Sequence, residues 1–473
     1  MSTIETVVDL IYLLAAALFV MGLHLMNSPA TARKGSQFSV VGMVLAICAT
    51  LAYLIDQGGG SATGWAVLAV GFVVGSLIGL RSADKVKMTD IPQLVSIFNA
   101  VGGGAAALVA LTDFVHDKNL HLATIAPTPA VATALDVLIG AVTFTGSIIA
   151  AGKLQGLISG SPIILPGSKI INSLLTIAGL GSAAFLFTGA ANTNVLIILL
   201  VAALLFGVTL VLPIGGADMP VVISLLNAFT GTAVAMAGFV INSSALIIAG
   251  ALVGASGTIL TKLMADAMNR SIPNIMIGGF GQGDAAAAGA VTSSGNIKQV
   301  SADDAAIQLA YANKVIFVPG YGLAAAQAQR ELKDLAQLLE DRNIEVIFAI
   351  HPVAGRMPGH MNVLLAEVDV PYPQLYEMEA ANLEFPTADV ALVIGANDVI
   401  NPAARRPGNA ISGMPILDVD KAKNVIVIKR SMGQGYAGID NELYLDEKTS
   451  MFFADGKKGL AQISSAVREL VTD

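Results

Sequence analysis

The chain is 473 residues long, which exceeds a single ordinary domain, and 55% of its residues are hydrophobic while only 13% are charged. The formal net charge of −8 comes wholly from the C-terminal part. Residues 1–270 carry ten Lys and Arg against ten Asp and Glu, and residues 271–473 carry 16 against 24. An acidic soluble part argues against nucleic acid as a partner, because phosphate binding needs a basic surface. The single cysteine, Cys48, excludes a disulfide framework and a cysteine-based metal site.

Long apolar runs fill the N-terminal part of the chain, and a bilayer core needs about 20 mostly apolar residues per helix. Nine spans are predicted near residues 7–23, 38–55, 64–80, 94–112, 131–151, 170–187, 194–212, 220–240 and 245–263. Cytoplasmic loops concentrate Lys and Arg. One alternate set of loops carries Lys118, and the other carries Arg33, Lys34, Arg81, Lys85, Lys87, Lys153 and Lys169. This bias predicts a multi-pass membrane protein with its N-terminus outside and its C-terminal part in the cytoplasm. The alternative is a large soluble protein with buried helices.

Polar side chains interrupt several of these predicted spans. Asn99 lies in the fourth, Asn227 in the eighth and Ser256 in the ninth, and Asp218 stands at the cytoplasmic mouth of the eighth. Each of these groups either bonds neighbouring helices together or lines a hydrated path. We expect no ionisable side chain near the middle of any span, so a proton would move through amides, hydroxyls and water.

The C-terminal part follows a Gly- and Ala-rich linker and has a different pattern. Short apolar runs predict strands at 314–318, 345–350, 368–370, 390–394, 425–428 and 451–453, with helices at 324–339 and 460–471. Strand–helix alternation predicts a doubly wound α/β fold of the Rossmann type. The predicted organisation is therefore an all-α membrane bundle at 1–270, a linker at 271–308 and an α/β domain at 309–473.

A glycine pattern stands between the first of these strands and a helix. Gly320 permits a tight turn, Gly322 lets the backbone approach a pyrophosphate, and Ala325 stands where a third glycine often packs the helix on the strand. The position after a buried strand makes a dinucleotide site the favoured interpretation. A second pattern, Gly433 to Gly438, has no helix after it and is better interpreted as a flexible lid.

The choice of nucleotide depends on two strand ends. The second strand ends in Ile350, His351 and Pro352, without the carboxylate that would bind the ribose of NAD. A later strand ends in Lys429, Arg430 and Ser431, which suit a 2′-phosphate and favour NADP, although two solvated loop charges are the alternative.

Asp398 follows a central strand, where ligands of open α/β sheets bind. It would either contact the nucleotide, or change protonation with its redox state, or cap a loop. His351 and His360 flank a Pro- and Gly-rich loop that we expect them to order, and their spacing forms no metal site.

These motifs together resemble the beta subunit of proton-translocating NAD(P) transhydrogenases over nearly the whole chain. The resemblance is carried by Gly215–Pro220, Val318–Ala325, the loop from His351 to His360, Gly395–Asp398 and Lys429–Gly438. It implies hydride transfer between NAD(H), held by a separate alpha subunit, and NADP(H), held here, coupled to inward proton movement. It further implies a dimer of alpha–beta units in membrane lipid, in the bacterial inner membrane.

The resemblance also implies roles for single residues. NADP(H) would be bound by Gly320, Tyr321, Gly322, Ala325, Arg356, Lys429, Arg430, Ser431 and a lid residue, Tyr436, and Asp398 would link nucleotide state to protonation. Some members of the family have a histidine where this chain has Asn99, and water held by Asn99 and Asn227 becomes the expected proton carrier. The rival interpretation is a cation channel or transporter gated by a nucleotide-sensing domain, although the chain has no Thr-Val-Gly-Tyr-Gly filter.

Overall fold

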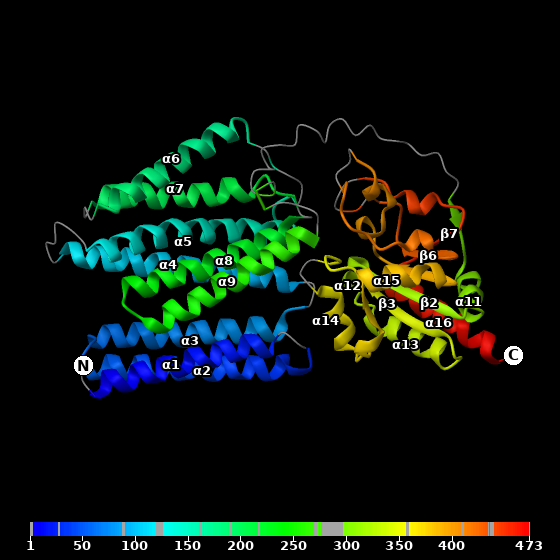
Figure 1. The fold of residues 1–473 in the computed structure, drawn as a ribbon, viewed down its shortest axis with the longest axis horizontal. Helices are drawn as coiled ribbons and strands as arrows, with labels where there is room; N and C mark the ends of the chain where they lie inside the picture. Colours follow the sequence, from blue (N-terminus) through cyan, green and yellow to red (C-terminus); the bar gives the residue numbers. More distant parts are fainter. Residues whose placement is uncertain are drawn as a thin grey trace. The chain divides into compact units, whose positions relative to one another are not determined.

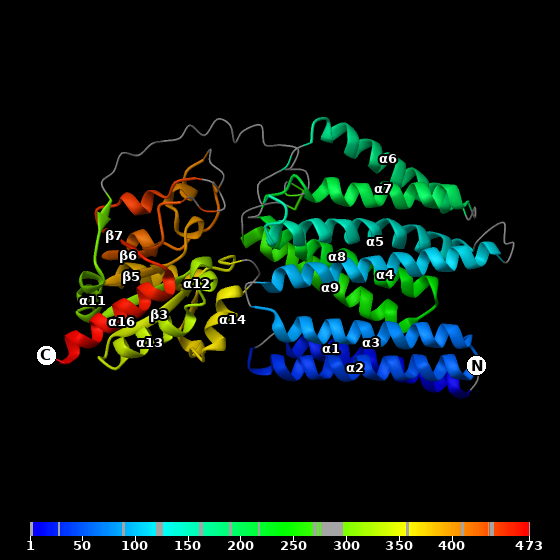
Figure 2. The same cartoon turned by 180° about the vertical axis from the view of Figure 1, so that it is seen from behind.

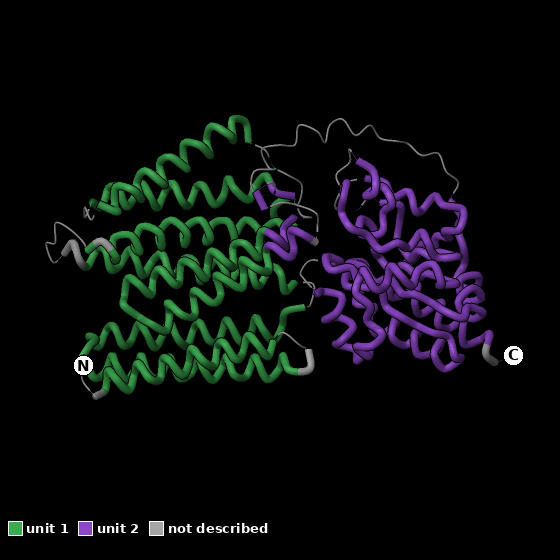
Figure 3. The backbone as a smooth tube through the Cα atoms, in the orientation of Figure 1, with its two compact units in different colours: residues 1–213, 222–261 green, residues 214–221, 262–473 purple. Residues whose placement is uncertain are grey.

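The computed structural model describes residues 3–472 except for 27–28, 88–89, 120–125, 160–162, 164, 189–191, 216–217, 268–271, 274, 276–296, 356–358, 408–410, 434 and 436–438. The chain divides into two compact units (Figure 3). The first comprises residues 1–213 and 222–261, and the second comprises residues 214–221 and 262–473. The Gly-rich part of the predicted linker, from Gly278 to Gly295, lies outside the described residues.

The first unit is a bundle of long helices (Figure 1). Within the described residues, nine helices are long and apolar enough to cross a membrane, as the sequence predicts. Their bounds are α1 Thr3–Leu25, α2 Pro29–Asp56, α3 Ala62–Lys85, α4 Ile91–Asn119, α5 Pro127–Leu154, α6 Ser168–Leu186, α7 Thr193–Val211, α8 Met219–Val240 and α9 Ser244–Ala267. The chain is therefore a multi-pass membrane protein.

Glycines bring the backbones of neighbouring helices close together in this bundle. A Cβ atom on Gly140 of α5 would lie 2.6 Å from the carbonyl oxygen of Gly103 on α4, and one on Gly207 of α7 would lie 2.4 Å from that of Val142 on α5. Figures 1 and 2 show α4 and α7 beside α5 from both sides. Small residues are what lipid-embedded helices need for close packing. Helix α3, in contrast, has no buried residue.

The second unit contains a seven-stranded sheet in which every neighbouring pair is parallel. Its strands are β1 Lys298–Gln299, β2 Lys314–Pro319, β3 Glu345–Ile350, β4 Leu375–Glu377, β5 Val390–Ile394, β6 Asn424–Lys429 and β7 Thr449–Phe453, in the order β1-β7-β6-β5-β2-β3-β4. Apart from β1, this is the 3-2-1-4-5-6 order of doubly wound dinucleotide-binding sheets. The predicted fold class is confirmed.

Helices cover both faces of the sheet, and its strands are therefore buried on both sides. One face carries Ile316, Val318, Ala391, Val393 and Val427, which pack with the helical segments α15 Met378–Glu384 and η4 Phe385–Thr387. Helices α11 Ala302–Ala310, α12 Tyr321–Ala326 and α13 Gln329–Glu340 all pack against the C-terminal helix α16 Gly456–Thr472. Helix α13 also contacts β3, and α16 contacts β6.

The remaining short elements connect the strands. They are α14 His360–Glu367, η3 Tyr372–Gln374, η5 Asp398–Ile400, η6 Pro402–Arg405, η7 Val419–Lys421 and η8 Glu442–Leu445.

Three details differ from the sequence prediction. The strand predicted at 368–370 is wrong, because α14 ends at Glu367 and Asp369 adopts a left-handed φ of 55°. The helix predicted at 324–339 is two helices, because Gln327 has φ 49° and separates α12 from α13. Part of the segment predicted as linker is folded, since β1 pairs with β7 and Ser301 begins α11 with a capping box.

Candidate dinucleotide-binding site

The candidate site lies where the strand order reverses, at the carboxyl ends of β2 and β5. Gly320 follows β2, and Gly395 follows β5 on the neighbouring strand. From this point the chain winds toward β4 on one side and toward β7 on the other. Open α/β sheets bind their ligands in the crevice at such a reversal. The predicted glycine pattern therefore lies between a strand and a helix, which is the context in which it indicates a dinucleotide site.

The two glycine turns are locked together by their backbones. Gly320 N–H donates to the Ile394 carbonyl oxygen at 2.9 Å, and Gly322 N–H donates to that of Gly395, also at 2.9 Å. A Cβ atom on Gly320 would lie 2.4 Å from Ala396 Cα, and one on Gly395 would lie 2.3 Å from Gly322 Cα. Gly395 also has φ 65°, which disfavours other residues. Because these glycines have no Cβ atom, the backbones that follow β2 and β5 can come into direct contact. Tyr321 is half-buried and Ala325 is exposed.

A polar network holds the segment after β5 in place. Asn441 Nδ2 donates to the Asn397 carbonyl oxygen at 3.0 Å. The Tyr444 hydroxyl lies 3.0 Å from Asn397 Oδ1 and 3.1 Å from the Ala396 carbonyl oxygen. Burial raises the pKa of Tyr444, so its hydroxyl stays protonated and able to donate. Asp398 begins η5 directly after this segment and is half-buried.

The end of β6 supplies cations beside this network. Lys429 Nζ lies 4.6 Å from the centre of the Tyr444 ring and donates to the Gly433 carbonyl oxygen at 2.5 Å. Burial lowers the pKa of Lys429, while the charge of Asp398 opposes that shift. Asp398 also lies under this loop, since a Cβ atom on Gly435 would come 2.3 Å from its Oδ1. The structure thus brings Asp398, Lys429 and the glycine turns together.

The next two residues, Arg430 and Ser431, are exposed. The Ser431 hydroxyl accepts from Gly433 N–H at 3.4 Å, and Arg430 makes no ion pair among the described residues. Arg356 and Tyr436, also predicted to bind the nucleotide, lie outside the described residues.

His351 and His360 are buried and order the loop that they flank. His351 Nδ1 accepts from Val353 N–H at 3.2 Å, and its Nε2 lies 2.8 Å from the Pro415 carbonyl oxygen, to which it donates. Burial lowers the pKa of His351 to about 4, so the ring is neutral at pH 7. A Cβ atom on Gly355 would lie 2.4 Å from His360 Nδ1. In the part of the chain that the structure describes, no His, Cys, Asp and Glu side chains cluster as a metal site.

Asn99 connects helices in the bundle. Its Nδ2 donates to the Ile223 carbonyl oxygen on α8 at 3.3 Å, and Thr230 Oγ1 donates back to the Asn99 carbonyl oxygen at 3.3 Å. One turn earlier on α4, Ser96 Oγ donates to the Ser147 carbonyl oxygen on α5 at 2.8 Å. A polar junction of α4, α5 and α8 therefore surrounds Asn99.

The other predicted membrane residues differ in their surroundings. Asn227 is half-buried one turn after Ile223 on α8, so it shares the face that meets Asn99. Ser256 is exposed on α9, and its hydroxyl donates to the Val253 carbonyl oxygen of its own helix. Asp218 is half-buried in the turn before α8, with its backbone N–H bonded to the Gly215 carbonyl oxygen. The structure places Asn227 on the face of α8 that also carries Ile223, the partner of Asn99, whereas Ser256 is exposed on α9.

Comparison with known proteins identifies the family. The family model of the NAD(P) transhydrogenase beta subunit matches residues 8–466. Two relatives named NAD(P) transhydrogenase subunit beta, one from Rhodospirillum rubrum and one from a named strain of that species, are each 48% identical over 461 residues, covering 96% of this chain and 98% of theirs. The chain belongs to the NAD(P) transhydrogenase beta subunit family.

Sequence reasoning missed two features of this transhydrogenase beta subunit. Tyr444 and Asn441 are buried behind the glycine turns, and no local pattern links them to residues more than 40 positions away. Asp136, which sequence reasoning did not single out because it lies near one end of the predicted span, is fully buried inside α5. The predicted span began at residue 131, but α5 begins at Pro127, so Asp136 lies about two and a half turns from the start of the helix.

Lys153, predicted in a loop of this transhydrogenase beta subunit, is buried in the last turn of α5. Its Nζ donates to the Leu212 carbonyl oxygen at the end of α7, at 2.5 Å. A cation at a helix C-terminus is stabilised by the unpaired carbonyls.

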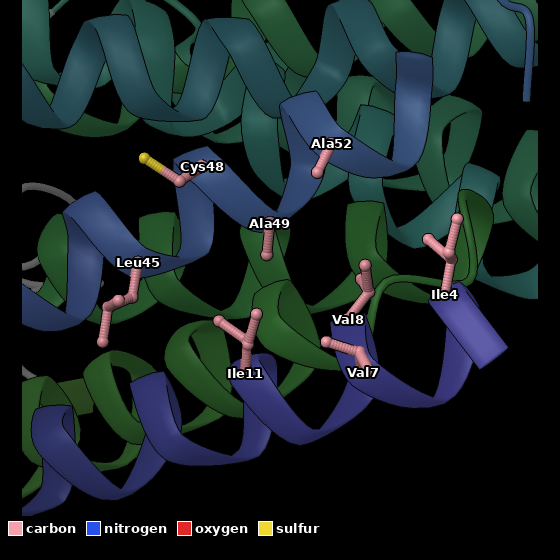
Figure 4. A pocket seen from close by; sticks show the side chains of 8 residues that line it. All are labelled: Ile4, Val7, Val8, Ile11, Leu45, Cys48, Ala49 and Ala52. Carbon is pink, nitrogen blue, oxygen red and sulfur yellow. The ribbon is translucent and has the colours of Figure 1, made fainter. Parts of the chain in front are cut away.

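A cleft of about 390 Å³ between α1 and α2 is a poor nucleotide site (Figure 4). Its lining is apolar apart from one thiol and consists of Ile4, Val7, Val8, Ile11, Leu45, Cys48, Ala49 and Ala52. Its lining includes no cation for a phosphate.

Proposed function

We propose that the second unit binds NADP(H) and exchanges hydride with NAD(H) held by a separate alpha subunit. The observation that carries the proposal is the pair of interlocked glycine turns at the reversal of the sheet, with Lys429 and Arg430 at the end of the neighbouring strand β6. The sequence offers one such turn with a strand before it and a helix after it, which supports a second nucleotide on a partner.

The residues of the site fit a phosphorylated dinucleotide. The glycine turns have no side chains, so a pyrophosphate can come close to their backbone, although the N–H groups of Gly320 and Gly322 already donate to carbonyl oxygens at the end of β5. The exposed guanidinium of Arg430 and the hydroxyl of Ser431 are donors suited to a 2′-phosphate. Bound NADP(H) supplies the nicotinamide that accepts or donates the hydride. Lys429, Tyr444 and Asn397 position the segment that carries Asp398, and Asp398 senses the state of the nucleotide through its own protonation.

We further propose that hydride exchange is coupled to inward proton movement through the bundle. NAD and NADP have nearly equal redox potentials, so uncoupled exchange would stop near equal ratios. One charge that crosses about 200 mV releases roughly 4.6 kcal/mol. At about 1.4 kcal/mol per tenfold, this shifts the ratio by about 10³. Water held by Asn99 and Asn227, at the junction of α4 and α8, carries the proton.

The proposed setting is the bacterial inner membrane, with the N-terminus outside and the second unit in the cytoplasm. The support is the loop charge bias, which stands at six cations against one even when the buried Lys153 is left out. Lipid or the membrane helices of an alpha subunit cover the apolar surface of helices such as α3, which has no buried residue of its own. We expect a dimer of alpha–beta units.

The test is hydride transfer in vesicles that contain the chain together with its alpha subunit. NADH is supplied with an NADP⁺ analogue, and reduction is followed with and without an imposed proton gradient. We expect the gradient to accelerate reduction and to raise the final ratio of reduced to oxidised analogue. Ion flux that responds to NADP(H) without hydride transfer would instead favour a nucleotide-gated channel.

A further inference from the structure

The membrane bundle contains a carboxyl group that the functional argument above does not use. Asp136 on α5 has no exposed surface, and neither of its carboxylate oxygens has a hydrogen-bond partner among the described residues. Protein side chains, rather than lipid, therefore enclose it. An unpaired ionised carboxylate in such surroundings is strongly unfavourable, whereas the protonated acid is far less so. Ionisable groups kept inside a membrane bundle commonly serve transport.

Asp136 stands at the head of a row of small and polar residues on one face of α5. Gly140, Thr143 and Ser147 follow it at intervals of four, three and four residues, which places all four side chains on the same face. Thr143 and Ser147 have no exposed surface. The distance along the helix axis from Asp136 to Ser147 is about 16 Å at 1.5 Å per residue.

This face of α5 packs on α4 and leads to the polar junction around Asn99. A Cβ atom on Gly140 would meet Gly103 and Ala107 of α4, and the Ser147 carbonyl oxygen accepts a hydrogen bond from the Ser96 hydroxyl. With the N-terminus outside, α5 runs inward, so Asp136 lies in the outer half of the bundle and Ser147 in the inner half. The row connects this buried site in the outer half of the bundle with the predicted proton path.

The surroundings of Asp136 are apolar. Ala110 and Phe114 of α4 and Leu199 of α7 belong to the cluster of buried side chains that includes its neighbour Val137. The described titratable side chains of the helices packed on α5 lie elsewhere: Asp113 and His116 near the outer end of α4, and Lys169 at the opposite end of α6. Helices α7 and α8 carry none within their described residues. A proton on Asp136 is therefore held without a competing charge from α6, α7 or α8.

We propose that Asp136 is the group that holds the translocated proton in the outer half of the bundle, an inference that rests on the proposed function. Its carboxylate takes a proton from the outer side and becomes the neutral acid. The proton then leaves to water along Thr143 and Ser147 toward Asn99, and the carboxylate is restored. Asn99 cannot itself titrate, so the chain has its titratable group on α5 instead.

The test is the variant Asp136→Asn in the complete alpha–beta complex, reconstituted in vesicles. Asparagine has nearly the shape of the protonated acid but cannot release a proton. We expect the acceleration of NADP⁺ reduction by an imposed gradient to disappear in the variant, while NADP⁺ binding stays within twofold of the wild type. Asp113→Asn, the same change on the half-buried carboxyl of α4, is the matched control and should keep the acceleration.

A second measurement does not depend on turnover. Infrared difference spectra between the NADP⁺ and NADPH forms of the wild-type complex should contain a protonated carboxyl band that Asp136→Asn removes and Asp113→Asn retains. If the gradient accelerates Asp136→Asn as much as the wild type, or if the band survives, Asp136 is not the proton site and the proposed function still stands. If the wild-type complex responds to no gradient, the proposed function fails and this inference fails with it.

Discussion

Replacing Arg430 with alanine should weaken NADP⁺ binding without affecting the fold. The side chain is exposed and makes no ion pair among the described residues, so its removal leaves no buried partner behind. Charge-assisted hydrogen bonds contribute about 1.5–3 kcal/mol each. One such bond to a 2′-phosphate, partly screened by water, contributes about 2 kcal/mol, which corresponds to an increase in Kd of about 30-fold.

A comparison of NADP⁺ with NAD⁺, which lacks the 2′-phosphate, tests this prediction more stringently. The Kd of the full chain for NADP⁺ and for NAD⁺ can be measured by titration calorimetry, in the wild type and in Arg430→Ala. The variant should lose affinity for NADP⁺ while its weak affinity for NAD⁺ stays unchanged. Arg406→Ala is a suitable control, because Arg406 is also an exposed arginine and pairs with Glu442. Equal losses for both nucleotides, or an unchanged Kd for NADP⁺, would refute the assignment of Arg430 to the 2′-phosphate.

Two further predictions concern the fold of the second unit. Gly395→Ala should lower the thermal stability of the unit far more than Gly359→Ala, measured as Tm. Both glycines have φ 65°, so both variants incur the left-handed penalty of about 1–2 kcal/mol, but only the added Cβ at Gly395 would meet a backbone, 2.3 Å from Gly322 Cα. Similar losses of Tm would show that the contact with Gly322 relaxes freely. The free energy of unfolding should also fall as the pH drops from 6.5 toward 4, because burial lowers the pKa of His351 from 6.5 to about 4 and the unfolded chain then binds a proton that the folded chain does not. Denaturant titrations across that range should find a loss of up to roughly 3 kcal/mol, and a smaller one in His351→Gln; an identical profile in that variant would assign the loss to other groups.

The fold was predictable where one physical signal dominates. Strands β2, β3 and β5 are buried on both faces of a parallel sheet, so they are continuous apolar runs, and the membrane helices are long apolar runs for a similar reason. The run at 368–370 has the composition of a strand but is too short to be distinguished from the end of a helix. At Gln327 the helix breaks without a glycine or a proline, so the sequence contains no signal for the break.

The candidate site was predictable only in part, because its residues come together through the sheet order. Gly320 and Lys429 each belong to a local pattern next to a strand. Asn397, Asn441 and Tyr444 meet across gaps of 44 to 47 residues, which only the three-dimensional fold brings together. The burial of Asp136 likewise depends on where α5 begins and on which of its faces meets α4, and neither can be derived from hydropathy.

The attachment of β1 determines how a force exerted by the first unit on the connecting chain would reach the candidate dinucleotide site. Its ladder with β7 is two residues long, so the edge of the sheet gives the incoming chain a weak hold. Helix α11 is the firmer anchor, since Ala305, Ala306 and Leu309 are fully buried and the helix packs on α16. A tensile load on the chain before residue 298 would peel β1 from β7 first and would then be borne by α16, whose start at Gly456 lies against Ala326 beside the glycine turn.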